Sequence, residues 1–222
     1  MKGEGATFVL RHPSFVTLMD SRFVDTAFGR AHARLAGSGP AVVFLHGRIP
    51  PLNNWQAWNT TLEEVAAAGF RAVAVELPGF GDAARPDGPI STESAVDCVL
   101  DVFDRLAISR VTLVGYNWGG LVAWRAAMIE PGRITKLALV AAEGAEQLSE
   151  SLPGEMKVPT LILWVDADFF LPVSQAEMFA KAIPNSQLHV FEFGEGQPEL
   201  AARAPQKLGK VFNERLIQFL KE

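Results

Sequence analysis

Short apolar runs that alternate with helical segments constrain the fold of this chain more than any other feature. The runs are AVVFLHG, RVTLVG, LALVAA and TLILWV. Because they lack the polar alternation of half-exposed strands, they are typical of strands buried on both faces of a sheet. Segments such as STESAVDCVLDVFDRL and VSQAEMFAKAI, which separate them, have helical periodicity. The pattern predicts an α/β fold with a mostly parallel sheet, helices on both faces and right-handed crossovers.

The organisation of the chain indicates one domain over residues 1–222, of which residues 1–19 form an N-terminal extension. The sequence has no repeat and no interdomain linker, and its one irregular stretch, EGAEQLSESLPGEMK, is too short for a second domain. Thr60 or Thr61 is expected to cap one helix, and Ser91 or Thr92 the next.

Charge and composition exclude several classes of function. The net charge of -5 disfavours non-specific binding to nucleic acid or to an anionic membrane. The single cysteine, Cys98, excludes an internal disulfide and is expected to pack in the core. No secretory signal or membrane-spanning run is found, so a cytoplasmic location is expected. The four histidines lack metal-ligand spacing, and neither a metal nor a cofactor is expected. The oligomeric state is not predicted.

The segment LVGYNWGG, residues 113–120, has the outline of a nucleophile elbow. A buried run enters a G-x-N-x-G turn, and residues 121–129 have the pattern of a helix. Acyl-transfer enzymes carry serine, cysteine or sometimes aspartate at the centre of such a turn. Here the central residue is Asn117, whose carboxamide is a very poor nucleophile near neutral pH.

Five motifs in this order resemble those of the α/β-hydrolase superfamily, along nearly the whole chain after about residue 20. They are the segment ending in VVFLHG, then VAVELPGFGDA, LVGYNWGG, LILWVDAD and FEFGEGQPE. The chain is most similar to small members without a cap domain, because LALVAA and VPTLILW are too close for a helical lid. The resemblance implies a single-domain α/β-hydrolase fold with an open site above the carboxyl ends of the strands.

The resemblance also assigns site residues. The nucleophile position is Asn117, the acid position is Asp168 with Asp166 as the fallback, and the histidine position is Gln197. An amide can neither attack a carbonyl usefully nor accept a proton near pH 7. The backbone N–H groups of Arg48 and Trp118 are expected to form an oxyanion hole, which does not depend on side chains.

The surroundings of these positions suggest a small ligand that is apolar or aromatic and contains a carbonyl group. Glu143 and Glu195 are expected at the rim, more often as solvated charges than as reacting groups. His46 has a structural role in most such loops, whereas Trp118 is expected to line the pocket. The pocket residues are expected to be His46, Gly47, Ile49, Trp55, Tyr116, Glu143, Phe169 and Phe170.

Three functions are compatible with these residues. The first is non-hydrolytic, cofactor-independent chemistry of the lyase, isomerase or cyclase type, with Asp168 as the base. The second is a catalytically inactive protein that binds a ligand or a partner. The third is a weak ester hydrolase in which water is activated directly.

Overall fold

The computed structural model describes residues 19–148, 156–166, 168, 170–192 and 204–222. The expected N-terminal extension, residues 1–19, lies almost entirely outside this part of the chain.

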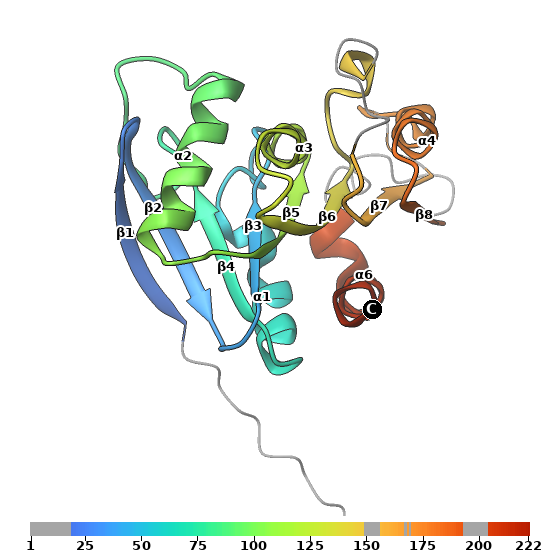
Figure 1. Cartoon of the computed structure of the whole chain (residues 1–222), viewed down its shortest axis with the longest axis horizontal. Coiled ribbons are helices and arrows are strands. Elements are labelled where there is room, and N and C mark those ends of the chain that lie inside the picture. Colours follow the sequence, from blue (N-terminus) through green and yellow to red (C-terminus); the bar gives the residue numbers. More distant parts are fainter. Residues whose placement is uncertain (1–18, 149–155, 167, 169, 193–203) are drawn as a thin grey trace, which may run out of the picture.

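One eight-stranded sheet, in the order β1-β2-β4-β3-β5-β6-β7-β8, forms the centre of the molecule (Figure 1). Strands β1 and β2 pair antiparallel, as do β2 and β4, and the other pairs are parallel. The prediction of a mostly parallel sheet is therefore confirmed. The strands are β1 (Asp20–Thr26), β2 (Gly29–Ala36), β3 (Ala41–Leu45), β4 (Arg71–Glu76), β5 (Val111–Tyr116), β6 (Ile134–Val140), β7 (Thr160–Val165) and β8 (Ser186–Phe191).

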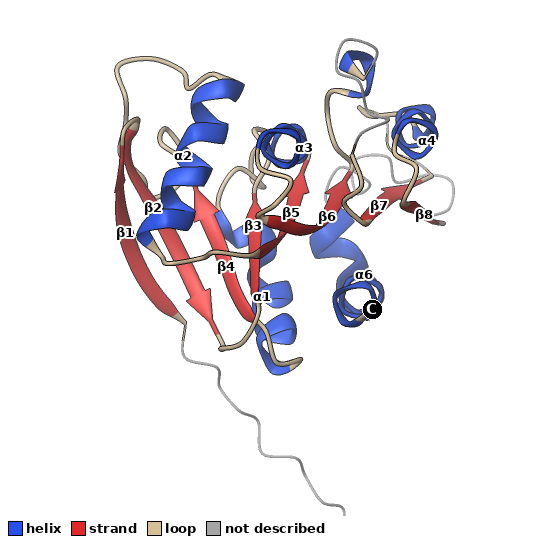
Figure 2. Cartoon of the chain, viewed as in Figure 1, coloured by secondary structure: helices blue, strands red, loops and turns tan. Residues whose placement is uncertain are grey.

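Helices cover both faces of this sheet, as Figure 2 shows. Helices α1 and α6 pack against each other on one face, and α2, α3 and α4 cover the other. The helices are α1 (Asn59–Ala67), α2 (Thr92–Arg105), α3 (Trp118–Ile129), α4 (Val173–Ala182) and α6 (Ala204–Lys221), with two short 3-10 helices, η1 (Trp55–Trp58) and η2 (Ala145–Gln147).

The two predicted helix caps have different outcomes. The Ser91 side chain accepts a hydrogen bond from the backbone N–H of Ser94, which confirms Ser91 as the cap of α2. The prediction that Thr60 or Thr61 caps α1 is wrong, because that helix begins at Asn59 and has no side-chain cap. Thr61 is instead buried and donates a hydrogen bond of 2.8 Å to Asn213 Oδ1 of α6.

The core extends over both faces of the sheet, and the five residues of β3 illustrate it, since four of them are buried. Cys98 is fully buried in α2, as expected, and burial raises the pKa of its thiol to about 11. Between β6 and β7 the described residues contain only η2, and there is no cap domain. Within the described residues, no helix has the length and apolar character needed to cross a membrane.

Candidate active site

Asn117 occupies a strained elbow between β5 and α3. Its backbone angles, φ 53° and ψ −120°, lie in a region that residues with a side chain rarely adopt. Four backbone hydrogen bonds hold this conformation: Asn117 N–H donates to Val140, and its carbonyl accepts from Gly120, Leu121 and Glu143. The motif therefore folds as the predicted elbow, and the strain places the residue 117 side chain at the carboxyl edge of the sheet.

Two glycines allow the loop after β3 to approach this elbow. A Cβ on Gly119 would lie 2.6 Å from the Leu45 carbonyl oxygen, so the start of α3 packs directly on the end of β3. A Cβ on Gly47 would lie 2.9 Å from Asn117 Cβ, so this loop contacts the elbow side chain itself. Residues with a side chain would separate the two loops.

The close approach brings together the two residues that are predicted to form an oxyanion hole. Arg48 follows Gly47, and Trp118 follows Asn117 at the first position of α3. Within the described part of the chain, the backbone N–H groups of Arg48 and Trp118 have no acceptor. The first N–H groups of a helix have no partner inside the helix, and they carry its positive dipole end. Such N–H groups suit a developing negative charge on a carbonyl oxygen.

The Asn117 side chain is buried and carries an unused acceptor. It is 3% exposed, and its Oδ1 atom has no hydrogen-bond partner among the described residues. A buried unsatisfied acceptor costs about 1–3 kcal/mol, which a folded protein rarely retains without a reason. A donor from a bound molecule would satisfy it.

Arg48 and Glu143 form an ion pair at the surface beside the elbow. Arg48 donates to Glu143 Oε2 at 2.8 Å, and its guanidinium lies 5.2 Å from the centre of the Trp118 ring. The Glu143 backbone N–H donates to the Asn117 carbonyl. The pair therefore joins the loop after β3 to the loop after β6, over the first residue of α3.

Asp168 follows β7 and is a buried carboxylate at this edge. It is 8% exposed, whereas Asp166 is exposed, which favours Asp168 for the acid position. Its Oδ1 atom accepts from the backbone N–H groups of Phe170, at 3.0 Å, and Leu171, at 2.9 Å. Burial raises the pKa of Asp168, and these two hydrogen bonds oppose the rise. One carboxylate oxygen is thus held by the loop.

Comparison with known proteins shows the family to which the chain belongs. The family of the alpha/beta hydrolase fold matches residues 40–157, which is more than half of the chain. The chain belongs to the alpha/beta hydrolase fold family. Epoxide hydrolase 2 of Siraitia grosvenorii is 40% identical to this α/β-hydrolase over 108 residues. These residues are 48% of this chain but only 33% of that protein, so the match spans a third of the length of this relative.

A second relative matches over nearly its full length. The 2-hydroxy-6-oxononadienedioate/2-hydroxy-6-oxononatrienedioate hydrolase of Cupriavidus pinatubonensis is 26% identical over 285 aligned positions, covering 93% of this chain and 94% of that protein. The alignment is longer than the 222 residues of this α/β-hydrolase, so the relative contains inserted residues that this chain lacks.

Solved structures share the fold at low sequence identity. A meta-cleavage product hydrolase from Pseudomonas fluorescens has a TM-score of 0.79 at 18% identity, over 90% of this chain and 97% of that one. An epoxide hydrolase from Vigna radiata has a TM-score of 0.77 at 16% identity, over 91% and 98%. The sheet and its helices are therefore those of α/β-hydrolases.

The expected pocket residues do not all lie at the elbow. Tyr116 is buried with its ring edge toward Trp58, and His46 is fully buried. His46 Nδ1 bonds the Gly47 carbonyl at 2.7 Å, and Nε2 accepts from Leu77 N–H at 3.3 Å, so this histidine ties two loops together. Burial lowers the pKa of His46, which favours the neutral ring. These contacts suit the structural role that is predicted for it.

Two tryptophans are placed differently from the expectation. The Trp118 indole is fully buried and donates a hydrogen bond of 3.0 Å to Thr92 Oγ1 of α2. Only the backbone N–H of Trp118, and not its ring, is therefore placed to contact a ligand at the elbow. The Trp55 ring lies under the Arg34 guanidinium, at 4.8 Å. Arg34 belongs to β2, which is separated from β5 by β4 and β3. The structure thus places the Trp55 ring away from the elbow, because the loop after β3 continues over β4.

Exposed apolar side chains remain near the strand ends. Ile49 is 38% exposed and Phe170 is 58% exposed, on the loops after β3 and β7. Gln197, Glu195 and Phe169 lie outside the described residues, so their predicted roles stay predictions.

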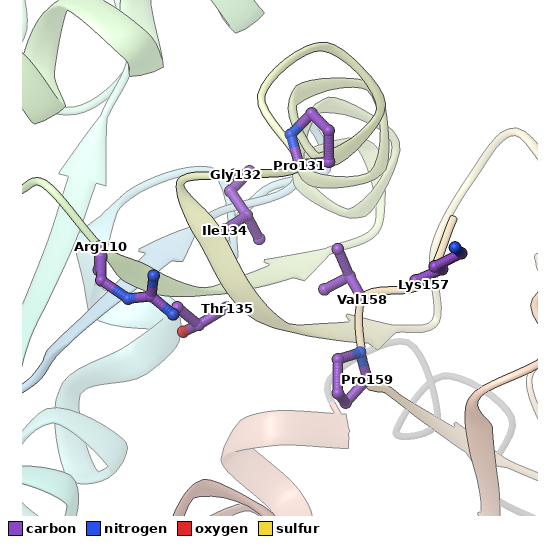
Figure 3. A pocket seen from close by; sticks show the side chains of 8 residues that line it. All are labelled: Arg110, Pro131, Gly132, Ile134, Thr135, Lys157, Val158 and Pro159. Carbon is purple, nitrogen blue, oxygen red and sulfur yellow. The ribbon is translucent and has the colours of Figure 1, made fainter. Parts of the chain in front are cut away.

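A cavity of about 640 Å³ lies at the opposite edge of the sheet (Figure 3). It is formed at the amino ends of β5, β6 and β7, whereas Asn117, Glu143 and Asp168 follow the carboxyl ends of the same strands. This cavity is therefore not part of the elbow site. Its lining residues are Arg110, Pro131, Gly132, Ile134, Thr135, Lys157, Val158 and Pro159.

The sequence analysis missed one buried polar network. Glu76, which ends β4, accepts hydrogen bonds from His32 Nδ1 at 2.7 Å, Trp55 N–H at 3.0 Å and Asp82 N–H at 2.8 Å. In the described part of the chain, His32, Glu76 and Asp82 also form the one group with metal-ligand atoms all within 4.8 Å of one another. Glu76 and Asp82 are close in the sequence, but His32 is 44 residues from Glu76, so no spacing pattern could have added it to them.

Proposed function

We propose that this α/β-hydrolase cleaves an apolar carbonyl compound with a directly activated water, without a covalent intermediate at the elbow. The observation that carries the proposal is the elbow itself, in which Asn117 is held beside two backbone donors that have no acceptor among the described residues. The hole needs no serine, and two N–H groups worth roughly 3 kcal/mol each would stabilise the charged carbonyl oxygen. The attacking group is then water instead of residue 117.

Asp168 and Asn117 are assigned complementary roles in this reaction. The Asp168 carboxylate takes one proton from water as the water oxygen bonds to the carbonyl carbon. The ester C–O bond then breaks, the leaving alcohol takes the proton from Asp168, and the carboxylic acid product is released. The raised pKa of Asp168 makes it a better base than an exposed aspartate. The unpaired Oδ1 of Asn117 accepts the second water proton in a hydrogen bond and so orients the nucleophile.

The relatives support hydrolysis over the other reactions. The relative whose match covers 93% of this chain is named a 2-hydroxy-6-oxononadienedioate/2-hydroxy-6-oxononatrienedioate hydrolase, and others are named epoxide hydrolases. Their names favour a hydrolytic reaction on an oxygen-containing carbon compound. The exposed Ile49 and Phe170 favour an apolar substrate.

A second candidate is non-hydrolytic proton transfer of the lyase, isomerase or cyclase type. It is favoured by the combination of an amide at position 117 and a buried carboxylate at position 168. The carboxylate would take a proton from the substrate and the amide would form a hydrogen bond with it, so no water is needed. The same oxyanion hole would stabilise an enolate.

The test is turnover of short-chain activated esters by the wild-type chain, Asn117→Ala and Asp168→Asn. We expect slow ester cleavage that Asp168→Asn lowers by about 10²-fold or more, since loss of a general base costs about 10²–10⁴-fold. Intact-mass analysis should find no acyl group on residue 117. Asp166→Asn, a change at an exposed neighbour, is the matched control and should leave the rate unchanged. Binding of carbonyl compounds with no turnover in any assay would contradict the proposal and indicate an inactive ligand-binding protein.

A further inference from the structure

A chain of hydrogen bonds with the connectivity of a catalytic triad lies on the hairpin formed by β1 and β2, away from the elbow. Ser21 Oγ is 2.8 Å from His32 Nε2, and His32 Nδ1 is 2.7 Å from Glu76 Oε2. In serine nucleophiles activated by histidine, the same two ring nitrogens contact the hydroxyl and the carboxylate. His32 and Glu76 are 2% and 1% exposed, whereas Ser21 is exposed.

The hydrogen bonds of Glu76 determine where the protons lie. Glu76 already accepts from the N–H groups of Trp55 and Asp82, as an ionised carboxylate does. A carboxylate that only accepts requires a donor at His32 Nδ1. The neutral His32 ring then carries its lone pair on Nε2, where it accepts the Ser21 hydroxyl proton. Glu76 therefore positions His32 as a base for Ser21.

The neighbouring side chains on this face suit an acyl donor. Ser21 pairs directly with Arg34, and Phe23 pairs with His32, so all four side chains share one face of the hairpin. Arg34 Nε is buried and has no hydrogen-bond partner among the described residues. Phe23 is 57% exposed, with its ring 5.0 Å from the His32 ring. A cation and an apolar surface thus flank the hydroxyl.

We propose that Ser21 is a second nucleophilic site, which accepts small apolar acyl groups from activated esters. Ser21 Oγ attacks the ester carbonyl carbon as His32 Nε2 takes the hydroxyl proton. Arg34 stabilises the negative charge on the carbonyl oxygen. The ester C–O bond then breaks, and the leaving alcohol takes the proton from His32. The products are acyl-Ser21 and a free alcohol.

The experiment is acylation of the full chain by 4-nitrophenyl acetate, with 4-nitrophenol release followed by absorbance and the acyl site by peptide mass analysis. We expect a burst of about one 4-nitrophenol per chain and an acetyl group on Ser21. Ser38, an exposed serine in the turn after β2 with no histidine partner among the described residues, is the control within the same chain. Ser21 should react at least about 100-fold faster than Ser38, in line with the 10²–10⁴-fold effect of a positioned base.

Variants separate activation from folding. Ser21→Ala should abolish the burst, and Ser38→Ala should leave it unchanged. Glu76→Gln should slow acylation of Ser21 at least tenfold without changing acylation of Ser38, and Glu76→Asp should retain most of the rate. Equal acylation of Ser21 and Ser38, or a burst that survives in Ser21→Ala, would overturn the proposal. Asn117→Ala changes the elbow and not this hairpin. A burst that persists in Asn117→Ala would show that acylation of Ser21 does not depend on the elbow site.

Discussion

At the scale of single residues, the site depends on two side chains whose surroundings change their chemistry. Asn117 has a buried acceptor with no partner among the described residues, and Asp168 is a carboxylate whose pKa is raised by burial. The identity and order of both residues could be predicted from the motifs. Their burial could not, because it depends on how the loops after β5 and β7 pack.

Burial of Asp168 predicts a specific pH dependence of stability. Since folding raises the pKa of Asp168, the folded state binds more protons than the unfolded state between the usual aspartate pKa, about 4, and the raised value. The contribution of Asp168 to stability is therefore lost as the pH rises through this window. Asp168→Asn removes this pH dependence. The free energy of unfolding of the variant, relative to that of the wild type, should therefore rise from pH 4 to pH 7.

Chemical denaturation at both pH values measures this difference. Asp166→Asn is the control, because its side chain is exposed and should give the same difference from wild type at both pH values. A constant difference for Asp168→Asn as well would show that Asp168 is not buried as described.

At the scale of elements, the site exists because α3 begins in contact with β3. The sequence predicts both elements and the turn between β5 and α3. It does not predict that the Gly119 Cα faces the Leu45 and His46 carbonyls, which is a contact between segments far apart in the chain. Likewise, a threonine before a helix often caps it, which is why a cap is expected at Thr60 or Thr61. In the structure, the Thr61 hydroxyl instead donates a hydrogen bond to Asn213, a residue distant in the sequence.

Gly119→Ala tests this packing. The added Cβ would lie 2.5 Å from the His46 carbonyl oxygen, so backbone must move, and we expect a loss of about 2–3 kcal/mol in the free energy of unfolding. Gly132→Ala is the matched control, because nothing lies within 4 Å of its Cβ and the change should stay within about 0.5 kcal/mol. Equal thermal denaturation of the two variants would contradict the described contact.

At the scale of the whole molecule, helices α1 and α6, which are far apart in the sequence, pack against each other on one face of the sheet. A buried hydrogen bond from Thr61 Oγ1 to Asn213 Oδ1 links them, and Asn213 Nδ2 has no partner among the described residues. The alternating pattern of the sequence predicts this layered fold, with helices on both faces, and the resemblance to small α/β-hydrolases implies that a cap domain is absent. It does not predict the Ser21, His32 and Glu76 network, since strand pairing alone brings these residues together.

Thr61→Val tests how strongly α6 is held. The substitution conserves shape but leaves Asn213 Oδ1 without its donor, so we expect a loss of about 1–3 kcal/mol in the free energy of unfolding. The double variant Thr61→Val with Asn213→Leu removes both polar groups and should recover part of the loss. Urea denaturation of the three proteins measures the effect, and an unchanged midpoint for Thr61→Val would show that the hydrogen bond contributes nothing.

The most direct test of the central claim is ester hydrolysis by the double replacement Asn117→Ser with Gln197→His. Both the replacement and its parent carry Ser21→Ala, so that the hairpin cannot contribute. If the elbow, the two backbone donors and Asp168 form a site that lacks only a serine nucleophile and its histidine partner, the double replacement should hydrolyse 4-nitrophenyl acetate at least about tenfold faster than its parent and should form an acyl group on residue 117. A correctly folded double replacement with no acyl group and no gain in rate would contradict the account.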